Sequence, residues 1–374
     1  MTDLLYTDVE ESLRGSVRST LQRSLDEGLP ARLADEPDTD VSALWRTLAE
    51  QLGVAGLLVP ESLGGVGASA REAAVVLEEL GRAVAPTPFL TSAVVATTTL
   101  LSAGDETHLP RLASGEVVAT LALPWTARRG AWSPVDGVVA PVAGALTADL
   151  FLVPVTDDGG ETSLRALGRD DVELEPITSL DMTRPLARVT VTGQGSEIAT
   201  GDAARAAVDA GLAAGAALLA SEQLGLAQWS LETTVEYAKT RVQFARPIGS
   251  FQAIKHRLAD LYLLLVGTQA AARQAAGVLA DDLGDTATGE ARHRGAAGEG
   301  FGHHEAVGLV PHRGHQGRAA GADQSRQVVL VEVSLIVDEP AQRRGDLLLE
   351  IPCVADGSGQ PEPTTRALGG LDRE

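Results

Sequence analysis

Two long segments with the residue pattern of α-helices lie close together in the second half of the sequence. One runs from Ala203 to Lys239, and the other runs from Ser250, a residue that can cap a helix N-terminus, to about Leu283. At 1.5 Å per residue, an unbroken helix over the first range would be about 55 Å long. Helices of this length usually pair in a bundle, so the sequence predicts a helical hairpin with two further bundle helices after Thr286.

Roughly the first 110 residues favour a separate all-helical unit. Apolar residues recur at four-residue steps from Val9 to Leu25, which keeps one face of a helix buried. Ser69 and Glu72 have the spacing of a capping box, and Gly81 is placed to end the helix that they begin. The predicted helices span Asp8 to Leu25, Val41 to Leu52, Ser69 to Leu80, and Thr91, as a cap, to Leu101.

Short runs of β-favouring residues, separated by Pro, Gly and Asp, lie between the helical parts. They span Val117 to Leu123, Leu150 to Val155, Val172 to Glu175 and Arg188 to Thr192. The predicted fold class is therefore a multidomain α+β protein. It has an N-terminal all-α domain at residues 1–112, a middle antiparallel β domain at 113–198, the first two helices of a C-terminal helical bundle at 199–285, and an atypical tail at 286–374.

Charge and cysteine content exclude several classes of protein. The chain has 30 Lys and Arg against 51 Asp and Glu, a net charge of −21, which argues against nucleic acid and anionic membrane surfaces as partners. The single cysteine, Cys353, excludes internal disulfides and Cys-based zinc sites. The acidic N-terminus is unlike a secretory or transit peptide, so a cytoplasmic location is expected. The weakly polar run from Gly211 to Ser221 is too short to span a bilayer, and no transmembrane helix is expected.

The tail from Thr286 differs in composition from the rest of the chain. After Tyr262 the only aromatic residue is Phe301, so the tail offers little large apolar surface and is expected to be disordered or poorly packed, apart from a strand-like run at 327–337. Five of the seven histidines lie within 23 residues, but without metal-ligand spacing, so no metal site is expected. These histidines are His293, His303, His304, His312 and His315. The excess of Arg over Lys is typical of a GC-rich gene, in which a frameshift near Thr286 would produce such a tail.

The link between the two long helices carries a long motif of chemically varied residues. It reads TRVQFARPIGSFQAIKHRLAD from Thr240 to Asp260, and it resembles the acyl-CoA dehydrogenase signature TR-x-QFG-x-PIG-x-FQ-x-x-x-H-x-LAD. Further segments resemble the same family in the same order: Pro60 to Leu90, the pair ATLALP and ADLFLVPV, and SLDMTRPLARV from Ser179 to Val189. The resemblance covers roughly residues 5–284. It implies the family's fold, which agrees with the predicted architecture.

The resemblance also implies FAD as the cofactor. Arg241 would grip the pyrophosphate of the dinucleotide, Gln252 would donate to and accept from the same dinucleotide, and Phe244 would pack nearby. Family homotetramers share such contacts between subunits, so these residues would serve a neighbour's cofactor. The competing interpretation is structural: Arg241 complements the carbonyl end of its helix, Phe244 belongs to the core, and Ser250 is a cap.

The reaction implied is α,β-dehydrogenation of an acyl-CoA thioester by an oxidoreductase acting on CH–CH groups. A carboxylate removes the Cα proton while the Cβ hydride passes to the flavin, and an electron-transfer flavoprotein then receives the electrons. Partners are thus the acyl-CoA substrate, that flavoprotein, and other subunits in a homo- or hetero-oligomer of lipid metabolism. One alternative is a non-catalytic flavin-binding or structural subunit that completes a partner's site. Another is an inactive product with an unfolded tail.

Two departures from the family pattern concern the chemistry. Where the family usually has ALTE in the β domain, this chain has Ala122-Leu123-Pro124-Trp125, and proline removes a backbone donor from a segment expected to contact flavin and substrate. No C-terminal motif for the catalytic Glu is visible, and at the other family position for the base stands Gly215. Glu222 lies about two helical turns away and is interpreted as a solvated helix residue. The catalytic residue is therefore unassigned.

Overall fold

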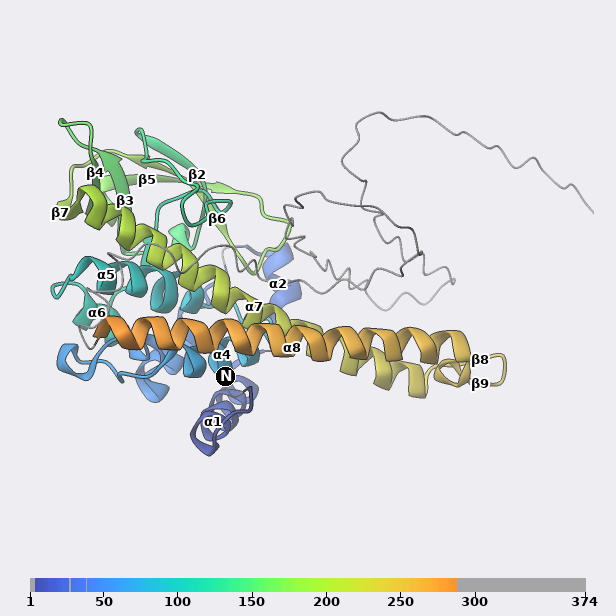
Figure 1. Ribbon diagram of the computed structural model, residues 1–374. Coiled ribbons are helices and arrows are strands. Elements are labelled where there is room, and N and C mark those ends of the chain that lie inside the picture. Colours follow the sequence, from blue (N-terminus) through green and yellow to red (C-terminus); the bar gives the residue numbers. More distant parts are fainter. Residues whose placement is uncertain (1–3, 27, 38, 288–374) are drawn as a thin grey trace, which may run out of the picture. The chain divides into compact units, whose positions relative to one another are not determined.

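The computed structural model describes residues 4–26, 28–37 and 39–287. These residues form helices first, then two β-sheets, then two long helices joined by a short hairpin (Figure 1). The order confirms the predicted α+β fold class. The predictions made for residues 288–374, namely disorder, the histidine group, the strand-like run, the frameshift and the last two bundle helices, lie outside the described residues.

Helices form the N-terminal part of the chain, and local capping explains where two of them begin. Ser69 begins α4: its hydroxyl accepts a hydrogen bond from the Arg71 N–H at 3.1 Å, and Glu72 accepts one from the Ser69 N–H at 2.9 Å. The predicted capping box is therefore confirmed, and Thr7 and Glu10 form a second one at the start of α1. The helices are α1 (Asp8–Ser24), α2 (Leu29–Asp35), α3 (Ser42–Arg46), η1 (Thr47–Gln51), η2 (Val54–Gly56), η3 (Glu61–Leu63), α4 (Ala70–Arg82), η4 (Phe89–Ala96), α5 (Thr97–Ala103) and α6 (Leu109–Ala113).

Two predicted helix boundaries in the N-terminal part of the chain are wrong. Gly81 does not end α4, which continues to Arg82. A Cβ atom on Gly81 would lie 1.9 Å from the backbone oxygen of Glu222, so this glycine allows close approach of another helix rather than termination. Thr91 is not a cap either: it lies inside η4, and its hydroxyl donates to the Pro88 carbonyl at 3.2 Å.

The middle of the chain forms two sheets. One has the strand order β1-β3-β4-β7, and the other has the order β2-β6-β5. All their pairings in the described residues are antiparallel except β1 with β3, which is parallel because the intervening β2 belongs to the other sheet and the chain must cross over. The strands are β1 (Ala119–Leu121), β2 (Val138–Ala143), β3 (Leu150–Thr156), β4 (Thr162–Gly168), β5 (Val172–Ile177), β6 (Leu186–Val191) and β7 (Ser196–Thr200); β2, β4 and β7 were not predicted.

The predicted pair of long helices is present as α7 (Gly201–Thr240) and α8 (Gln252–Ala287), with 40 and 36 residues. The first turns of α7 join the core of the β-sheets through Ala204, Ala207 and Val208, and the rest of α7 packs against α4, α5 and α8. By length and composition alone α7 could cross a membrane, but a core helix of a soluble protein passes the same test. Ser250 does not cap α8: it lies in the turn η7 (Ile248–Ser250), and its buried hydroxyl has no hydrogen-bond partner.

Close contact between α4 and α7 depends on two glycines. Gly81 of α4 faces the backbone of Glu222, and Gly225 of α7 faces the backbone of Glu78, where an added Cβ would again lie 1.9 Å from a carbonyl oxygen. Contacts of this kind let two helix backbones approach further than side chains would permit. The spacing of α4 and α7 is therefore fixed by residues that have no side chain.

Two adjacent glutamates on α4 hold α1 through buried ion pairs. The side chains of Glu78 and Glu79 are only 1% and 2% exposed. Arg14 donates to both of them, at 2.8 Å and 2.9 Å, and Arg18 donates to Glu79 at 2.7 Å and 2.8 Å. Removing one partner of such a pair leaves a buried charge uncompensated, so these residues are coupled.

The same glutamates connect α4 to the start of the chain and to α8. The Tyr6 hydroxyl donates to Glu78 at 2.5 Å, and burial together with the charge of Glu78 raises the pKa of Tyr6 above its ordinary value. Arg273 of α8 lies 4.1 Å from the centroid of the Tyr6 ring and donates to the Leu4 carbonyl at 3.0 Å. Glu78 therefore lies where α1, α4, α7 and α8 meet.

Substitution of the contact glycines tests this packing. Gly81→Ala and Gly225→Ala should each lower the free energy of unfolding by about 2–3 kcal/mol, because the added methyl group meets backbone atoms. Gly267→Ala in α8 is the matched control: nothing lies within 4 Å of its Cβ position, so it should gain about 0.5–1 kcal/mol from helix propensity. Urea titration measures both effects. Equal effects at all three positions would contradict the account.

Candidate functional site

The hairpin between α7 and α8 carries the residues of the family motif. It consists of β8 (Val242–Gln243), β9 (Arg246–Pro247) and the turn η7, and the Ile248 N–H donates to the Arg241 carbonyl at 2.8 Å across it. The turn between the two strands uses Phe244 and Ala245 at φ +52° and +61°. Left-handed backbone is expected of a tight two-residue hairpin turn, but it is costly for residues other than glycine.

Aromatic and cationic side chains gather at this hairpin. The Phe244 and Phe251 rings meet edge to face with centroids 6.2 Å apart, and the Arg246 guanidinium lies 4.0 Å from the Phe251 centroid. Phe244 is 87% exposed, so the interpretation of Phe244 as a core residue is wrong. Arg241 and Gln252 are exposed as well, on either side of the hairpin.

The donor set of the hairpin fits a dinucleotide. Arg241 offers a planar set of donors suited to a pyrophosphate, and Gln252 offers both a donor and an acceptor. Between them in sequence, the Ser250 hydroxyl is buried without a hydrogen-bond partner. A buried hydroxyl without a partner is unusual and favours a polar group bound close by. The roles of Arg241, Phe244 and Gln252 toward the cofactor nevertheless remain predictions.

The segment after β1, where the family pattern is broken, has its backbone donors engaged. The Ala122 N–H donates to the Leu152 carbonyl at 2.9 Å, the Leu123 N–H to the Leu121 carbonyl at 2.9 Å, and the Trp125 N–H to the Pro141 carbonyl at 2.8 Å. Pro124 has no N–H to donate. The four residues from Ala122 to Trp125 therefore offer no spare backbone donor to a ligand.

Gly215 and Glu222 are the two α7 positions considered for the catalytic base, and both are engaged by other parts of the chain. A Cβ atom on Gly215 would lie 2.7 Å from the Val95 side chain, so the position is packed against η4. Glu222 is 12% exposed and forms an ion pair with Arg184, so its interpretation as a solvated residue is wrong. The sequence contained a partial indication of this ion pair, because Arg184 belongs to the family-like segment SLDMTRPLARV. No feature of the sequence, however, linked Arg184 to Glu222.

Arg184 joins three parts of the chain. Besides Glu222 of α7, it donates at 3.2 Å to the Ala85 carbonyl, just after α4, and to the Thr183 carbonyl in the segment before β6. Burial by itself would lower the pKa of Arg184, but the charge of Glu222 and their hydrogen bond raise it above its ordinary value. Through these contacts Glu222 and Arg184 connect α7 to the segment before β6.

Three fully buried glutamates are paired in the same way. Glu78 and Glu79 are held by Arg14 and Arg18, and Glu10 accepts from Arg71 at 2.6 Å. Burial would raise the pKa of Glu10, but hydrogen bonds from Arg71 and Thr7 outweigh it and hold the pKa below its ordinary value. Among the described residues, each buried glutamate thus has a cationic partner, and the catalytic base remains unassigned.

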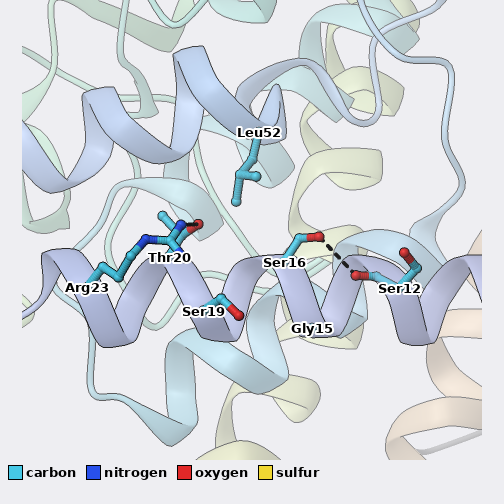
Figure 2. Close-up of a pocket in the computed structure, with 7 residues that line it drawn as sticks. All are labelled: Ser12, Gly15, Ser16, Ser19, Thr20, Arg23 and Leu52. Atoms are coloured by element: carbon cyan, nitrogen blue, oxygen red, sulfur yellow. Dashed lines mark hydrogen bonds between the residues drawn. The ribbon is translucent and has the colours of Figure 1, made fainter.

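Two surface hollows lie away from the hairpin. A shallow groove of about 470 Å³ is lined by α1 hydroxyl groups, Arg23 and Leu52, and Figure 2 shows Ser16 hydrogen-bonded to Ser12 along the helix. A second hollow of about 150 Å³ is lined by residues that include His108, Arg111 and Asp149. Neither contains a residue of the hairpin. Within the described part of the chain, no three His, Cys, Asp or Glu side chains come together as a metal site.

Comparison with known proteins identifies the class. Residues 7–116 match the acyl-CoA dehydrogenase N-terminal domain, and residues 204–293 match the acyl-CoA dehydrogenase C-terminal domain. The acyl-CoA dehydrogenase IpdE2 of Mycobacterium tuberculosis is 39% identical over 289 residues, which cover 76% of this chain and 78% of the relative. The chain belongs to the acyl-CoA dehydrogenase family. The family prediction is thereby confirmed.

Solved structures agree with this fold. The ChsE4–ChsE5 complex from Mycobacterium tuberculosis matches with a TM-score of 0.61 and 26% identity, covering 78% of this chain and 87% of the other. An acyl-CoA dehydrogenase complexed with FAD from Bacillus anthracis matches with a TM-score of 0.66 and 19% identity, covering 79% and 56%. The predicted enzyme class, an oxidoreductase acting on CH–CH groups, and FAD as its cofactor are confirmed by family membership.

Backbone strain in the hairpin can be tested directly. Ala245→Gly should raise the free energy of unfolding by about 0.5–1 kcal/mol, because glycine adopts φ +61° without a Cβ clash and this relief exceeds its entropic cost. Ala270→Gly, at an exposed position inside α8, should lower it by about 1 kcal/mol. Thermal and urea unfolding of the two variants measure the difference. Destabilisation by both would show that the turn at Ala245 is unstrained.

Proposed function

We propose that the chain takes part in the α,β-dehydrogenation of an acyl-CoA thioester, with the acyl chain drawn from lipid, sterol side-chain or secondary metabolism. A carboxylate would remove the Cα proton, which the thioester carbonyl acidifies. The observation that carries the proposal is the hairpin, which presents Arg241, Phe244 and Gln252 together on the surface in a chain of this family.

FAD, when bound, supplies the acceptor for the hydride that leaves Cβ. The hairpin residues would hold it: Arg241 pairs with the pyrophosphate, Gln252 makes hydrogen bonds to the dinucleotide, and Phe244 offers an exposed apolar face. The Ser250 hydroxyl is a further donor that lacks a partner within the chain.

The hairpin would serve a neighbouring subunit. Its elements β8, β9 and η7 make their main contacts with one another and with α7 and α8, and not with the strands of the middle domain. A cofactor held by the hairpin and also facing a β domain would therefore use the β domain of another subunit. This supports an oligomer in which each flavin site is shared.

A non-catalytic role in a hetero-oligomer is the second candidate. It is favoured by the pairing of each described buried glutamate with an arginine, which leaves no free base among them. The similar ChsE4–ChsE5 structure is a complex of two different chains. In this alternative, the present chain contributes its hairpin and a partner contributes the base.

Two further parts of the proposal concern the electron acceptor and the cellular location. An electron-transfer flavoprotein would accept the electrons, and the protein would work in the cytoplasm. Both proposals rest on the resemblance of the motif between α7 and α8 to the acyl-CoA dehydrogenase signature. Stopped-flow transfer from the reduced protein to such a flavoprotein tests the first, and cell fractionation tests the second.

Anaerobic titration with a panel of acyl-CoA thioesters tests the function. Purified protein should carry a visible flavin spectrum that one of the thioesters bleaches. Arg241→Ala should weaken FAD binding about tenfold or more, because a charge-assisted contact to the pyrophosphate is lost. Arg188→Ala is the matched control, since Arg188 is exposed on β6 and pairs only with the exposed Glu175.

The outcomes separate the two candidates. Bleaching by an acyl-CoA supports the enzyme, whereas bound flavin that bleaches only after co-expression with a partner subunit supports the hetero-oligomer. Unchanged FAD affinity in Arg241→Ala would contradict the role given to the hairpin.

A further inference from the structure

The short segment before α1 connects two helices that are far apart in sequence. Residues 4–6, which we call the strap, belong to no helix or strand. The Leu4 carbonyl accepts a hydrogen bond from Arg273 of α8 at 3.0 Å, and the Leu5 carbonyl accepts one from Arg71 of α4 at 2.7 Å. Two consecutive carbonyl groups of the strap are therefore bound to two different helices.

Tyr6 adds side-chain contacts to this connection. Its hydroxyl donates to Glu78 of α4 at 2.5 Å, and the Glu78 side chain is only 1% exposed. The guanidinium groups of Arg273 and Arg14 lie 4.1 Å and 5.0 Å from the centroid of the Tyr6 ring. One side chain of the strap thus contacts α1, α4 and α8.

Apolar burial holds α8 over only part of its length. No residue from 252 to 271 is buried. The buried residues of the described second half are mostly small: Ala272, Ala276, Gly277 and Leu279. Hydrophobic stabilisation scales with the apolar area removed from water, and small side chains remove little. Polar contacts therefore contribute much of what holds α8 in place.

Arg273 makes the docking of α8 depend on the strap. Its side chain is 15% exposed, and its Nε atom lies 3.9 Å from Glu78 Oε1 without a hydrogen-bond partner. Removal of the Leu4 carbonyl and the Tyr6 ring would leave a largely buried guanidinium with fewer partners, which is unfavourable. A state with α8 docked and the strap detached is therefore costly.

We infer that the strap locks the second half of α8 against α4, and that release of the strap frees this half of α8 while α4 and α7 stay folded. A terminal segment held by a few polar contacts can detach locally, without global unfolding. The crossing of α4 and α7 at Gly81 and Gly225 does not involve the strap, so it persists when the strap is released.

The position of α8 gives this device its consequence. The helix runs without interruption from Gln252, which borders the hairpin, past the strap contact at Arg273. The start of the chain is thus connected to the helix that carries one of the predicted cofactor residues. The inference goes beyond the proposed function, and its test uses no flavin signal.

Hydrogen–deuterium exchange of the full-length protein, read by mass spectrometry, tests the inference. In Tyr6→Ala, the amides of residues 272–283 should exchange about tenfold or more faster than in wild type, because Arg273 loses the ring beneath it. Amides of α4 should stay within about twofold, since Arg14 and Arg18 still pair with its glutamates. Val9→Ala, at a position of α1 that is 70% exposed, is the control and should leave both helices within about twofold.

Two further variants show how the strap acts. Tyr6→Phe keeps the ring and removes only the hydroxyl, so it should accelerate exchange in α8 less than Tyr6→Ala does, and it provides the test if Tyr6→Ala does not fold. Arg273→Ala should accelerate the same amides by itself. Adding Tyr6→Ala to Arg273→Ala should then change α8 exchange by less than about twofold, because contacting residues are not additive.

Three results would overturn the inference. The first is unchanged exchange in α8 when Tyr6 is replaced. The second is equal acceleration in α4, α8 and the β-sheets, which would make Tyr6 an ordinary contribution to global stability. The third is full additivity of the Tyr6 and Arg273 variants, which would show that the strap does not act through Arg273.

Discussion

The crossing of α4 and α7 through Gly81 and Gly225 is the contact on which the rest of the structure depends. Because the two backbones touch there, Glu78 of α4 and Glu222 of α7 are both brought into the interior. Glu78 then organises α1 and α8 through arginines and Tyr6, and Glu222 holds Arg184 of the middle domain. One close helix contact thus positions the N-terminal helices, the β-sheets and the long hairpin relative to one another.

Much of this fold was predictable, because long helices and capping boxes are local features. The pattern located α7 and α8 and the start of α4 at Ser69. The pattern failed where contacts between distant segments determine the role of a residue. Gly81 resembles a helix end but allows α4 and α7 to cross closely, and Ser250 resembles a cap but lies in a turn. Strand β2 was missed because Pro141 interrupts its run, and proline is normally excluded from strand interiors.

The candidate site also has a part that the sequence predicted and a part that it did not. The motif predicted Arg241, Phe244 and Gln252, and the structure brings them to one exposed hairpin. The ion pair between Arg184 and Glu222 could not be read from the sequence, because its partners are 38 residues apart and come from different domains.

We propose that the hairpin of one subunit completes the flavin site of another. Sedimentation velocity of the purified protein, followed at a flavin absorption wavelength, tests this most directly over a dilution series. The account predicts that flavin sediments only with dimers or larger species and is released as they dissociate. Flavin that sediments with a stable monomer would contradict it.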